Sequence, residues 1–162
     1  MLNLILRRCS KGYDAVYNFY YALSWCYKRK HFEGRCYKYF GSRVTWGEAE
    51  LHCVRERANL VSIHSLNEHN FVNLLIKNFD PTRSLTWIGL TDMHKEGGWI
   101  WSDGSKYRFS RWNSGQPDNA RGIENCGHTN YGSNFFWNDS VCSNKFAFVC
   151  TIRWHYIFPK DC

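Results

Sequence analysis

Apolar residues recur at helical spacing in two segments of the chain. The first segment opens with Thr45 and Glu48, which stand three positions apart as in a capping box, and it predicts a helix to about Arg57. Since such a helix buries one face, its inner side should hold the residues that repeat every three or four positions. Those residues are Trp46, Ala49, Cys53 and Val54.

The second helical segment repeats the same start signal with Ser65 and Glu68. It should end at Asp80, because the following Pro81 disfavours helical backbone in the residue before it. The residues expected to face inward are Phe71, Leu74, Leu75 and Phe79.

Short apolar runs elsewhere predict strands. They lie at 36–40, 60–63, 85–90, 98–104 (a strand followed by a turn), 135–139 and 146–150. From Lys106 to about Asn134 polar and glycine residues dominate and the periodicity fades, which predicts a long loop. Two helices, short strands and one long loop region indicate an α+β domain.

Size and aromatic content support a single domain with a substantial core. The chain has 162 residues, among them 8 Trp, 10 Tyr and 11 Phe, which provide a large area to bury. The tryptophans expected in the core, and not on an exposed stacking surface, are Trp87, Trp99, Trp101, Trp112 and Trp137.

The cysteines indicate an oxidising compartment. Eight cysteines in so short a chain predict a disulfide framework, and no C-x-x-C pair supports a zinc ribbon. The pairing does not follow from the count alone. We therefore expect a secreted protein, although the chain shows no clear signal peptide. The apolar run Leu2–Leu6 is followed by Arg7 and Arg8, and residues 15–25 are too few to cross a bilayer.

The positive charge is concentrated at the start of the chain. Residues 1–44 carry nine Lys/Arg and two acidic residues, whereas residues 45–162 carry twelve of each and are neutral overall. A nucleic-acid groove is therefore not expected, because the basic excess lies outside the predicted domain. A solvated basic segment is the simpler interpretation, with weak, salt-dependent attraction to sulfated glycans or anionic surfaces as the alternative.

Candidate chemistry is concentrated in the long loop and the strand after it. Five oxygen-bearing side chains occur there: Gln116, Asp118, Glu124, Asn138 and Asp139. Carboxylate and amide oxygens are the ligands that calcium takes. A bridge between Cys126 and Cys142 would bring the later members of the set to one place. The pattern predicts a divalent-ion site on loops, and an open ion there can hold a ligand.

The order of motifs along the chain resembles the C-type lectin domain family. The matching strings run from Cys36-Tyr37 through "TWGEAELHC", "ANLVSIHS", "WIGL", "WSDG", "QPD", "ENC" and "WND" to "FVC". They cover roughly Cys26 to Ile152 in the family's order. The resemblance implies a lectin domain at 26–152, preceded by a basic and aromatic extension at 1–25 and followed by a tail at 153–162.

The resemblance also implies a disulfide pairing and a fold. The pairs would be Cys26–Cys36, Cys53–Cys150 and Cys126–Cys142. Cys9 and Cys162 remain, and three alternatives are open for them: they join the termini, link two chains or stay free. The fold would be a disulfide-stabilised α+β C-type lectin fold with two helices, short antiparallel sheets and a long calcium-binding loop region.

The family's calcium site maps onto the five residues named above, which would hold the ion and contact the sugar. The backbone carbonyl of Asp139 would be a sixth ligand, and Pro117 should follow a cis peptide bond. A second, weaker calcium site would use Asp92, Glu96, Asn119 and Asn125.

The implied function is calcium-dependent binding of sugars without catalysis. In this family Gln-Pro-Asp is associated with galactose and N-acetylgalactosamine, which points to such sugars on glycoproteins or microbial surfaces. No aromatic residue lies between Asp118 and Glu124 to stack on the ring, which leaves Tyr131, His128 or Phe135 as substitutes. Since single sites are weak, a homo-oligomer would supply avidity, with Cys9 or Cys162 available as the link. The alternatives are a type II antifreeze-like ice-binding protein and a protein-binding module.

Overall fold

The computed structural model describes Cys26 and residues 29–153. These residues belong to two compact units, one comprising residues 38–151 and the other the described residues of 26–37 and 152–153. In the smaller unit, β1 (Lys30–Phe32) pairs antiparallel with the start of β2 (Arg35–Val44). The Cys26–Cys36 disulfide implied by the family resemblance is present in this unit.

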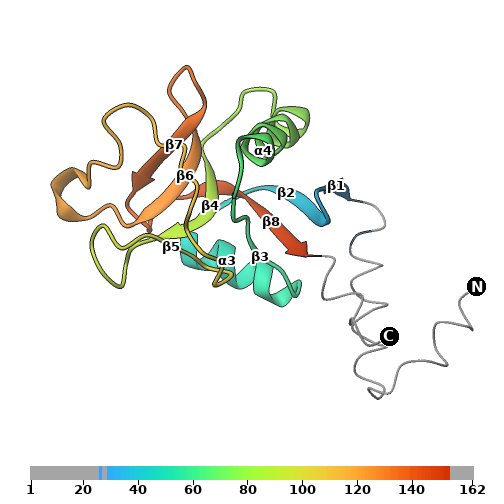
Figure 1. The fold of residues 1–162 in the computed structure, drawn as a ribbon, viewed down its shortest axis with the longest axis horizontal. Helices are drawn as coiled ribbons and strands as arrows, with labels where there is room; N and C mark the ends of the chain where they lie inside the picture. The colour runs from blue at the N-terminus through green and yellow to red at the C-terminus, as the bar shows by residue number, and fades with distance from the viewer. Residues whose placement is uncertain (1–25, 27–28, 154–162) are drawn as a thin grey trace, which may run out of the picture. The chain divides into compact units, whose positions relative to one another are not determined.

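The larger unit is built on a mixed sheet in which β2, β8, β4, β6 and β7 follow one another (Figure 1). The bounds of the further strands are β3 Asn59–Leu60, β4 Thr86–Thr91, β5 Ile100–Trp101, β6 Cys126–Tyr131, β7 Phe136–Ser140 and β8 Phe146–Arg153. Strands β4 and β8 run parallel, while β4–β6 and β6–β7 are antiparallel. The short strands β3 and β5 pair with β8 and β4. This is the predicted α+β C-type lectin fold, with one correction: the parallel pairing of β4 and β8 makes the sheet mixed, whereas antiparallel sheets were predicted.

Helix α3 (Trp46–Arg55) begins where the capping box predicts. The Thr45 hydroxyl accepts a hydrogen bond from the Glu48 N–H, and the Glu48 carboxylate accepts one from the Thr45 N–H at 2.9 Å. Trp46, Ala49 and Cys53 face the core, and Cys53 forms the disulfide with Cys150. The inward position predicted for Val54 is wrong, because this side chain is 50% exposed.

Helix α4 (Leu66–Phe79) starts after the predicted cap, Ser65, and ends before Asp80, but its inner face differs from the prediction. Leu75 is buried as predicted, whereas Leu74 and Phe79 are more than half exposed and Phe71 is only partly buried. The residues that face the core are His69, Val72, Asn73, Leu75 and Ile76, together with Glu68 near the start of the helix. Three of these six side chains are polar, so the apolar periodicity points to the wrong face.

The partners of these polar side chains explain the rotation of α4. His69 Nδ1 accepts a hydrogen bond from the Trp137 indole at 3.1 Å. Asn73 donates one to the Phe135 carbonyl at 3.1 Å and accepts one from the Thr129 hydroxyl at 3.2 Å. Burial of a polar side chain costs little free energy when that side chain has a hydrogen-bond partner. His69 and Asn73 therefore lie on the buried face of α4. We call His69, Asn73, Thr129 and Trp137 the closed polar cluster.

The strand predictions need two corrections. The loop expected to reach about Asn134 contains strand β6, whose residues 126–130 are all buried. The sequence pattern did not predict this strand because its side chains are mostly polar. In the structure the polar side chains of His128, Thr129 and Asn130 each have a hydrogen-bond partner inside the molecule. The strand predicted at 60–63 is reduced to Asn59–Leu60, whereas the one predicted at 36–40 extends over the whole of β2.

The aromatic core largely follows the prediction. Trp87, Trp101 and Trp137 are among the largest fully buried side chains. Trp99 and Trp112 are only partly buried and pack against each other, with 4.8 Å between ring centroids. None of the helices in the described residues combines the length and apolar character required to span a bilayer.

Candidate calcium and carbohydrate site

The loop between β5 and β6 lies on the side of the sheet that carries β6 and β7 (Figure 1). The Gln116–Pro117 peptide bond is cis, as predicted. Asn119 then adopts a left-handed backbone, and a short 3-10 turn, η2 (Ala120–Gly122), reverses the chain. The Cys126–Cys142 disulfide ties the start of β6 to the residues that follow β7.

Three carboxylates meet at this loop. One ligand oxygen each of Asp118, Glu124 and Asp139 lies within 4.8 Å of the other two. Asp139 is completely buried, and its carboxylate accepts hydrogen bonds from the backbone N–H groups of Asp118 at 3.2 Å and Asn119 at 2.7 Å. Asp139 on β7 therefore holds the loop that carries Asp118.

Two amide oxygens complete the set. Gln116 Oε1 and Asn138 Oδ1 are buried and have no hydrogen-bond partner among the described residues. A buried acceptor without a donor is uncommon and calls for a specific explanation. The structure brings the three carboxylates of the predicted set together, and Gln116 and Asn138 are near neighbours in sequence of Asp118 and Asp139. We call the five residues the oxygen cluster.

Electrostatics in the oxygen cluster favour a cation. Burial raises the pKa of Glu124, the Ala120 N–H opposes that rise, and the nearby carboxylates Asp139 and Asp118 add to it. Negative charges brought together in this way repel one another, and a divalent cation would remove the repulsion. The donors are all hard oxygens, as calcium requires, so the residues fit that ion.

One predicted ligand is engaged differently in the structure. The Asp139 carbonyl accepts a hydrogen bond from Asn138 Nδ2 at 2.6 Å. The same Nδ2 lies 3.3 Å from His128 Nε2, so the Asn138 amide group has neighbours on its nitrogen side.

The residues of the predicted second calcium site are partly brought together. Asn119 Nδ2 donates to the Glu96 carboxylate at 2.5 Å, and the Asp92 N–H donates to the Asn125 carbonyl at 3.2 Å. Asp92 is buried, with one carboxylate oxygen bonded to the Gly97 N–H at 2.8 Å and the other without a partner in the described structure.

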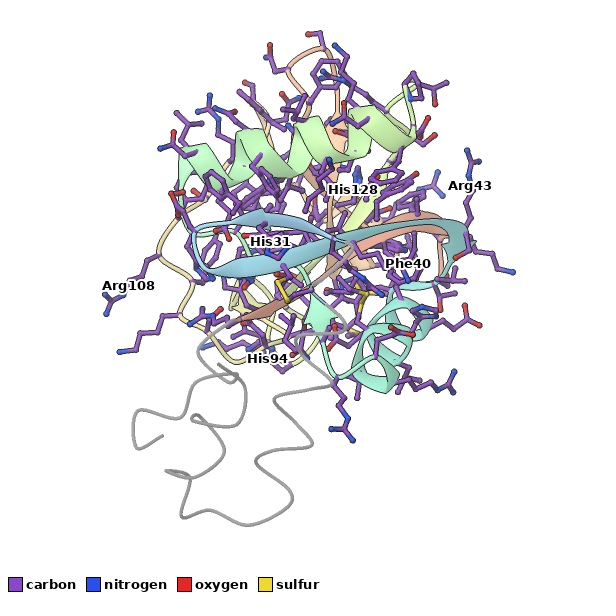
Figure 2. The ribbon with its side chains drawn as sticks, turned by 90° about the vertical axis from the view of Figure 1, so that its right-hand side faces the viewer. His31, Phe40, Arg43, His94, Arg108 and His128 are labelled. Atoms are coloured by element: carbon purple, nitrogen blue, oxygen red, sulfur yellow. A yellow bond between two sulfur atoms is a disulfide. The ribbon has the colours of Figure 1, made fainter. Side chains whose placement is uncertain are left out.

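The aromatic residues predicted to stack on a sugar lie in different surroundings. His128 is only 1% exposed and lies inside the molecule (Figure 2), so the suggestion that it stacks on a sugar is wrong. Tyr131 is partly buried, with its ring centroid 6.0 Å from that of His128. Phe135 is partly covered by the Arg83 guanidinium, 4.0 Å from the ring centroid. An apolar side chain that sequence reasoning missed is Ile123, which is 50% exposed beside Glu124. Its signal was an isolated apolar residue in a polar loop.

Comparison with known proteins decides the family. Residues 42–152 match the family model described as the lectin C-type domain. The chain belongs to the C-type lectin domain family. It is therefore a carbohydrate-binding domain by family and not an enzyme.

Several relatives of this C-type lectin domain are named for their sugars. The galactose-specific lectin nattectin of Thalassophryne nattereri is 41% identical over 120 residues, which are 74% of this chain and 75% of that protein. The lactose-binding lectin l-2 of Anguilla japonica is 41% identical over 75% of this chain and 74% of its own. The alpha-N-acetylgalactosamine-specific lectin of Patiria pectinifera is 40% identical over 74% of each chain.

Solved structures of two kinds are similar to this C-type lectin domain. The C-type lectin CEL-I from Cucumaria echinata is 32% identical with a TM-score of 0.74, covering 77% of this chain and 94% of its own. The herring type II antifreeze protein is 34% identical with a TM-score of 0.71, covering 76% of this chain and 94% of its own.

Proposed function

We propose that this domain binds terminal galactose-type sugars on glycoproteins or microbial surfaces through a calcium ion. The ion would be held by the oxygen cluster: Gln116, Asp118, Glu124, Asn138 and Asp139. The observation that carries the proposal is the pair of buried amide oxygens without donors beside three mutually close carboxylates. No hydrogen-bond donor in the described residues satisfies these two oxygens. A calcium ion would, because it binds about six to eight oxygen ligands.

Sugar recognition would use the remaining positions of the ion. Two neighbouring hydroxyls of a sugar complete the calcium shell, while each also donates to a carboxylate and accepts from an amide N–H. The Gln116-Pro117-Asp118 triplet and the sugars named for the relatives support a galactose-type ligand. In place of a stacked aromatic ring, the exposed Ile123 supplies an apolar contact for the sugar.

A second calcium ion would be held more weakly by Asp92, Glu96, Asn119 and Asn125. The unpartnered oxygen of buried Asp92 and the direct contact between Glu96 and Asn119 support this site. Two of the four side chains are amides, which coordinate the ion but do not offset its charge. We therefore expect lower affinity here than at the oxygen cluster.

We also propose a secreted protein that acts as an oligomer. Three disulfides in the described residues favour an oxidising compartment. A single sugar site is weak, so useful affinity would come from several sites held together. Cys9 and Cys162, either of which would be available to link two chains, lie outside the described residues.

Ice binding is the second candidate, because the herring type II antifreeze protein is as similar in structure as the lectins are. Thermal hysteresis of the purified protein would distinguish the two functions. A protein-binding module is less well supported, since it would have no need for the intact set of five oxygen ligands.

The direct test is retention on immobilised galactose with calcium and again with a chelator. We expect Asp118→Ala and Asn138→Ala each to abolish calcium-dependent retention without unfolding the domain. Asn70→Ala, an exposed position on α4, is the matched control and should be retained like the wild type. Unchanged retention of both loop variants would contradict the assignment, and a glycan array would then identify any other sugar.

A further inference from the structure

His128 and Asn138 stand opposite each other on neighbouring strands. The register of β6 and β7 pairs the two residues directly. In an antiparallel pair, directly opposed side chains lie on the same face and within reach of each other. His128 Nε2 accordingly lies 3.3 Å from Asn138 Nδ2. The buried His128 side chain thus contacts Asn138, a member of the oxygen cluster, on the nitrogen side of its amide group.

The roles of the two imidazole nitrogens follow from the neighbours of His128. Its Nδ1 lies 3.2 Å from the Thr129 carbonyl, and a carbonyl oxygen only accepts hydrogen bonds. Nδ1 therefore carries the proton, and in the neutral ring Nε2 presents a lone pair. That lone pair can accept a hydrogen bond from Asn138.

Aromatic neighbours hold the ring of His128 in this orientation. Phe146 and Trp87 contact it edge-on, at centroid distances of 5.2 and 6.1 Å, and Tyr131 does so at 6.0 Å. Since protein interiors are close-packed, a ring held on several sides does not turn freely. The position of Nε2 is therefore set by the core and not by the loop.

Two acceptors decide which way the Asn138 amide points. Its nitrogen donates to His128 Nε2 and to the Asp139 carbonyl, at 3.3 and 2.6 Å. A reversed amide would place its oxygen against both acceptors and lose both hydrogen bonds. The amide oxygen is therefore directed to the other side, where it is buried and has no partner in the described structure.

We propose that His128 is a positioning residue that orients the Asn138 amide so that its oxygen is presented to the calcium ion. This role rests on the proposed calcium site and deepens it. His128 itself, 1% exposed, would touch neither the ion nor the sugar. Loss of a residue that orients a metal ligand in this way typically lowers metal affinity by about 10–100-fold.

The test compares two substitutions of His128 by calorimetric titration with calcium alone. His128→Leu removes the acceptor, and we expect calcium affinity to fall by about 10–100-fold. His128→Gln places a carbonyl oxygen near the position of Nε2 and should recover most of the affinity. Equal affinities of His128→Leu and the wild type would overturn the role, as would a His128→Gln variant that binds no better than His128→Leu.

A second buried histidine provides the matched control. His69 has an exposed fraction of 1% and is hydrogen-bonded to Trp137 and Asn73, and in the described part of the chain its side chain makes no hydrogen bond to the oxygen cluster. His69→Leu should lower the melting temperature yet leave calcium affinity within about twofold of the wild type. A loss of affinity as large as that of His128→Leu would show a general effect of core disruption and overturn the role.

The tautomer of His128 can also be measured in the calcium-free wild type, which needs no folded variant. Nitrogen-15 NMR of the imidazole should show the proton on Nδ1 and an unprotonated Nε2, and the opposite tautomer would overturn the role. If the wild type takes up no calcium, the proposed function itself fails. If it binds calcium while His128→Leu binds equally well, only the positioning role fails.

Discussion

Two regions of the larger unit bury polar side chains, and they differ in how completely those groups are satisfied. In the closed polar cluster, His69, Asn73, Thr129 and the Trp137 indole all have neighbours at 3.1–3.3 Å. In the oxygen cluster, the amide oxygens of Gln116 and Asn138 have none among the described residues. Both regions draw on strand β7, which carries Trp137 of the first region and Asn138 and Asp139 of the second.

This difference separates a structural role from a binding role. Polar groups that satisfy one another stabilise a unique packing and leave nothing for a ligand. Acceptor oxygens that remain unpaired, next to carboxylates that repel one another, impose a cost that a cation would remove. The comparison therefore predicts that substitutions in the closed polar cluster change stability, and that substitutions in the oxygen cluster change calcium binding.

The largest effect is expected from Asp139→Ala. This buried carboxylate both supplies a ligand oxygen and holds the N–H groups of Asp118 and Asn119. Calcium affinity measured by calorimetry should fall by more than about a hundredfold. Loss of a residue that only orients a ligand costs at most about that much.

Asp80→Ala is the matched control for that experiment. Asp80 also organises a turn, since it accepts hydrogen bonds from the N–H groups of Thr82 and Ser84 and from the Thr82 hydroxyl. The bond from the Thr82 hydroxyl, followed by that from the Ser84 N–H, lowers the pKa of Asp80 to about 2. Its removal should reduce stability without affecting calcium uptake. Equal losses of calcium binding in both variants would contradict the distinction between the two regions.

The closed polar cluster should make stability depend on pH. Burial, with a smaller contribution from Arg111, lowers the pKa of His69 from 6.5 to about 4. Between pH 6.5 and pH 4, His69 therefore binds a proton in the unfolded chain but not in the folded protein. The contribution of neutral His69 to the free energy of unfolding is complete above pH 6.5 and is lost as pH falls towards 4. The loss is at most about 3 kcal/mol.

The measurement is urea unfolding between pH 7 and pH 4, for the wild type and His69→Gln. His128, whose pKa burial also lowers to about 4, contributes in the same direction, so the variant should keep part of the slope. A slope identical to that of the wild type would show that His69 is not the responsible group.

Asn73→Leu should have a smaller effect, confined to stability. The substitution leaves the Phe135 carbonyl and the Thr129 hydroxyl without the hydrogen bonds that Asn73 provides. Buried groups that lose a partner cost about 1–3 kcal/mol, which denaturant unfolding would detect. Calcium affinity should remain as in the wild type, and a marked loss would mean that the two regions are coupled.

The smallest effect is expected from Asp118→Asn in the calcium-free protein. The change removes one of three like charges whose oxygens lie within 4.8 Å, at an exposed position. Stability should rise slightly, by less than about 1 kcal/mol, because exposed charges are well screened. A decrease in the calcium-free melting temperature would argue against charge repulsion in the oxygen cluster.

Features that depend on neighbours in sequence could be predicted without the structure. At both helix starts the hydroxyl of the cap residue, Thr45 or Ser65, accepts a hydrogen bond from the backbone N–H three residues later. The buried strand around Trp87 follows a continuous apolar run. The members of the oxygen cluster were recognisable by their chemistry and by the family's motifs. The structure then brought three of their carboxylates together.

Without the structure, the kind of domain and the composition of its candidate site could be assigned. Three features became visible only in the folded molecule: which face of α4 is buried, that polar β6 is a strand, and that His128 is paired with Asn138 across β6 and β7. The physical reason is that a polar residue is buried only where a partner satisfies it. That partner can lie far along the chain, as Trp137 does from His69.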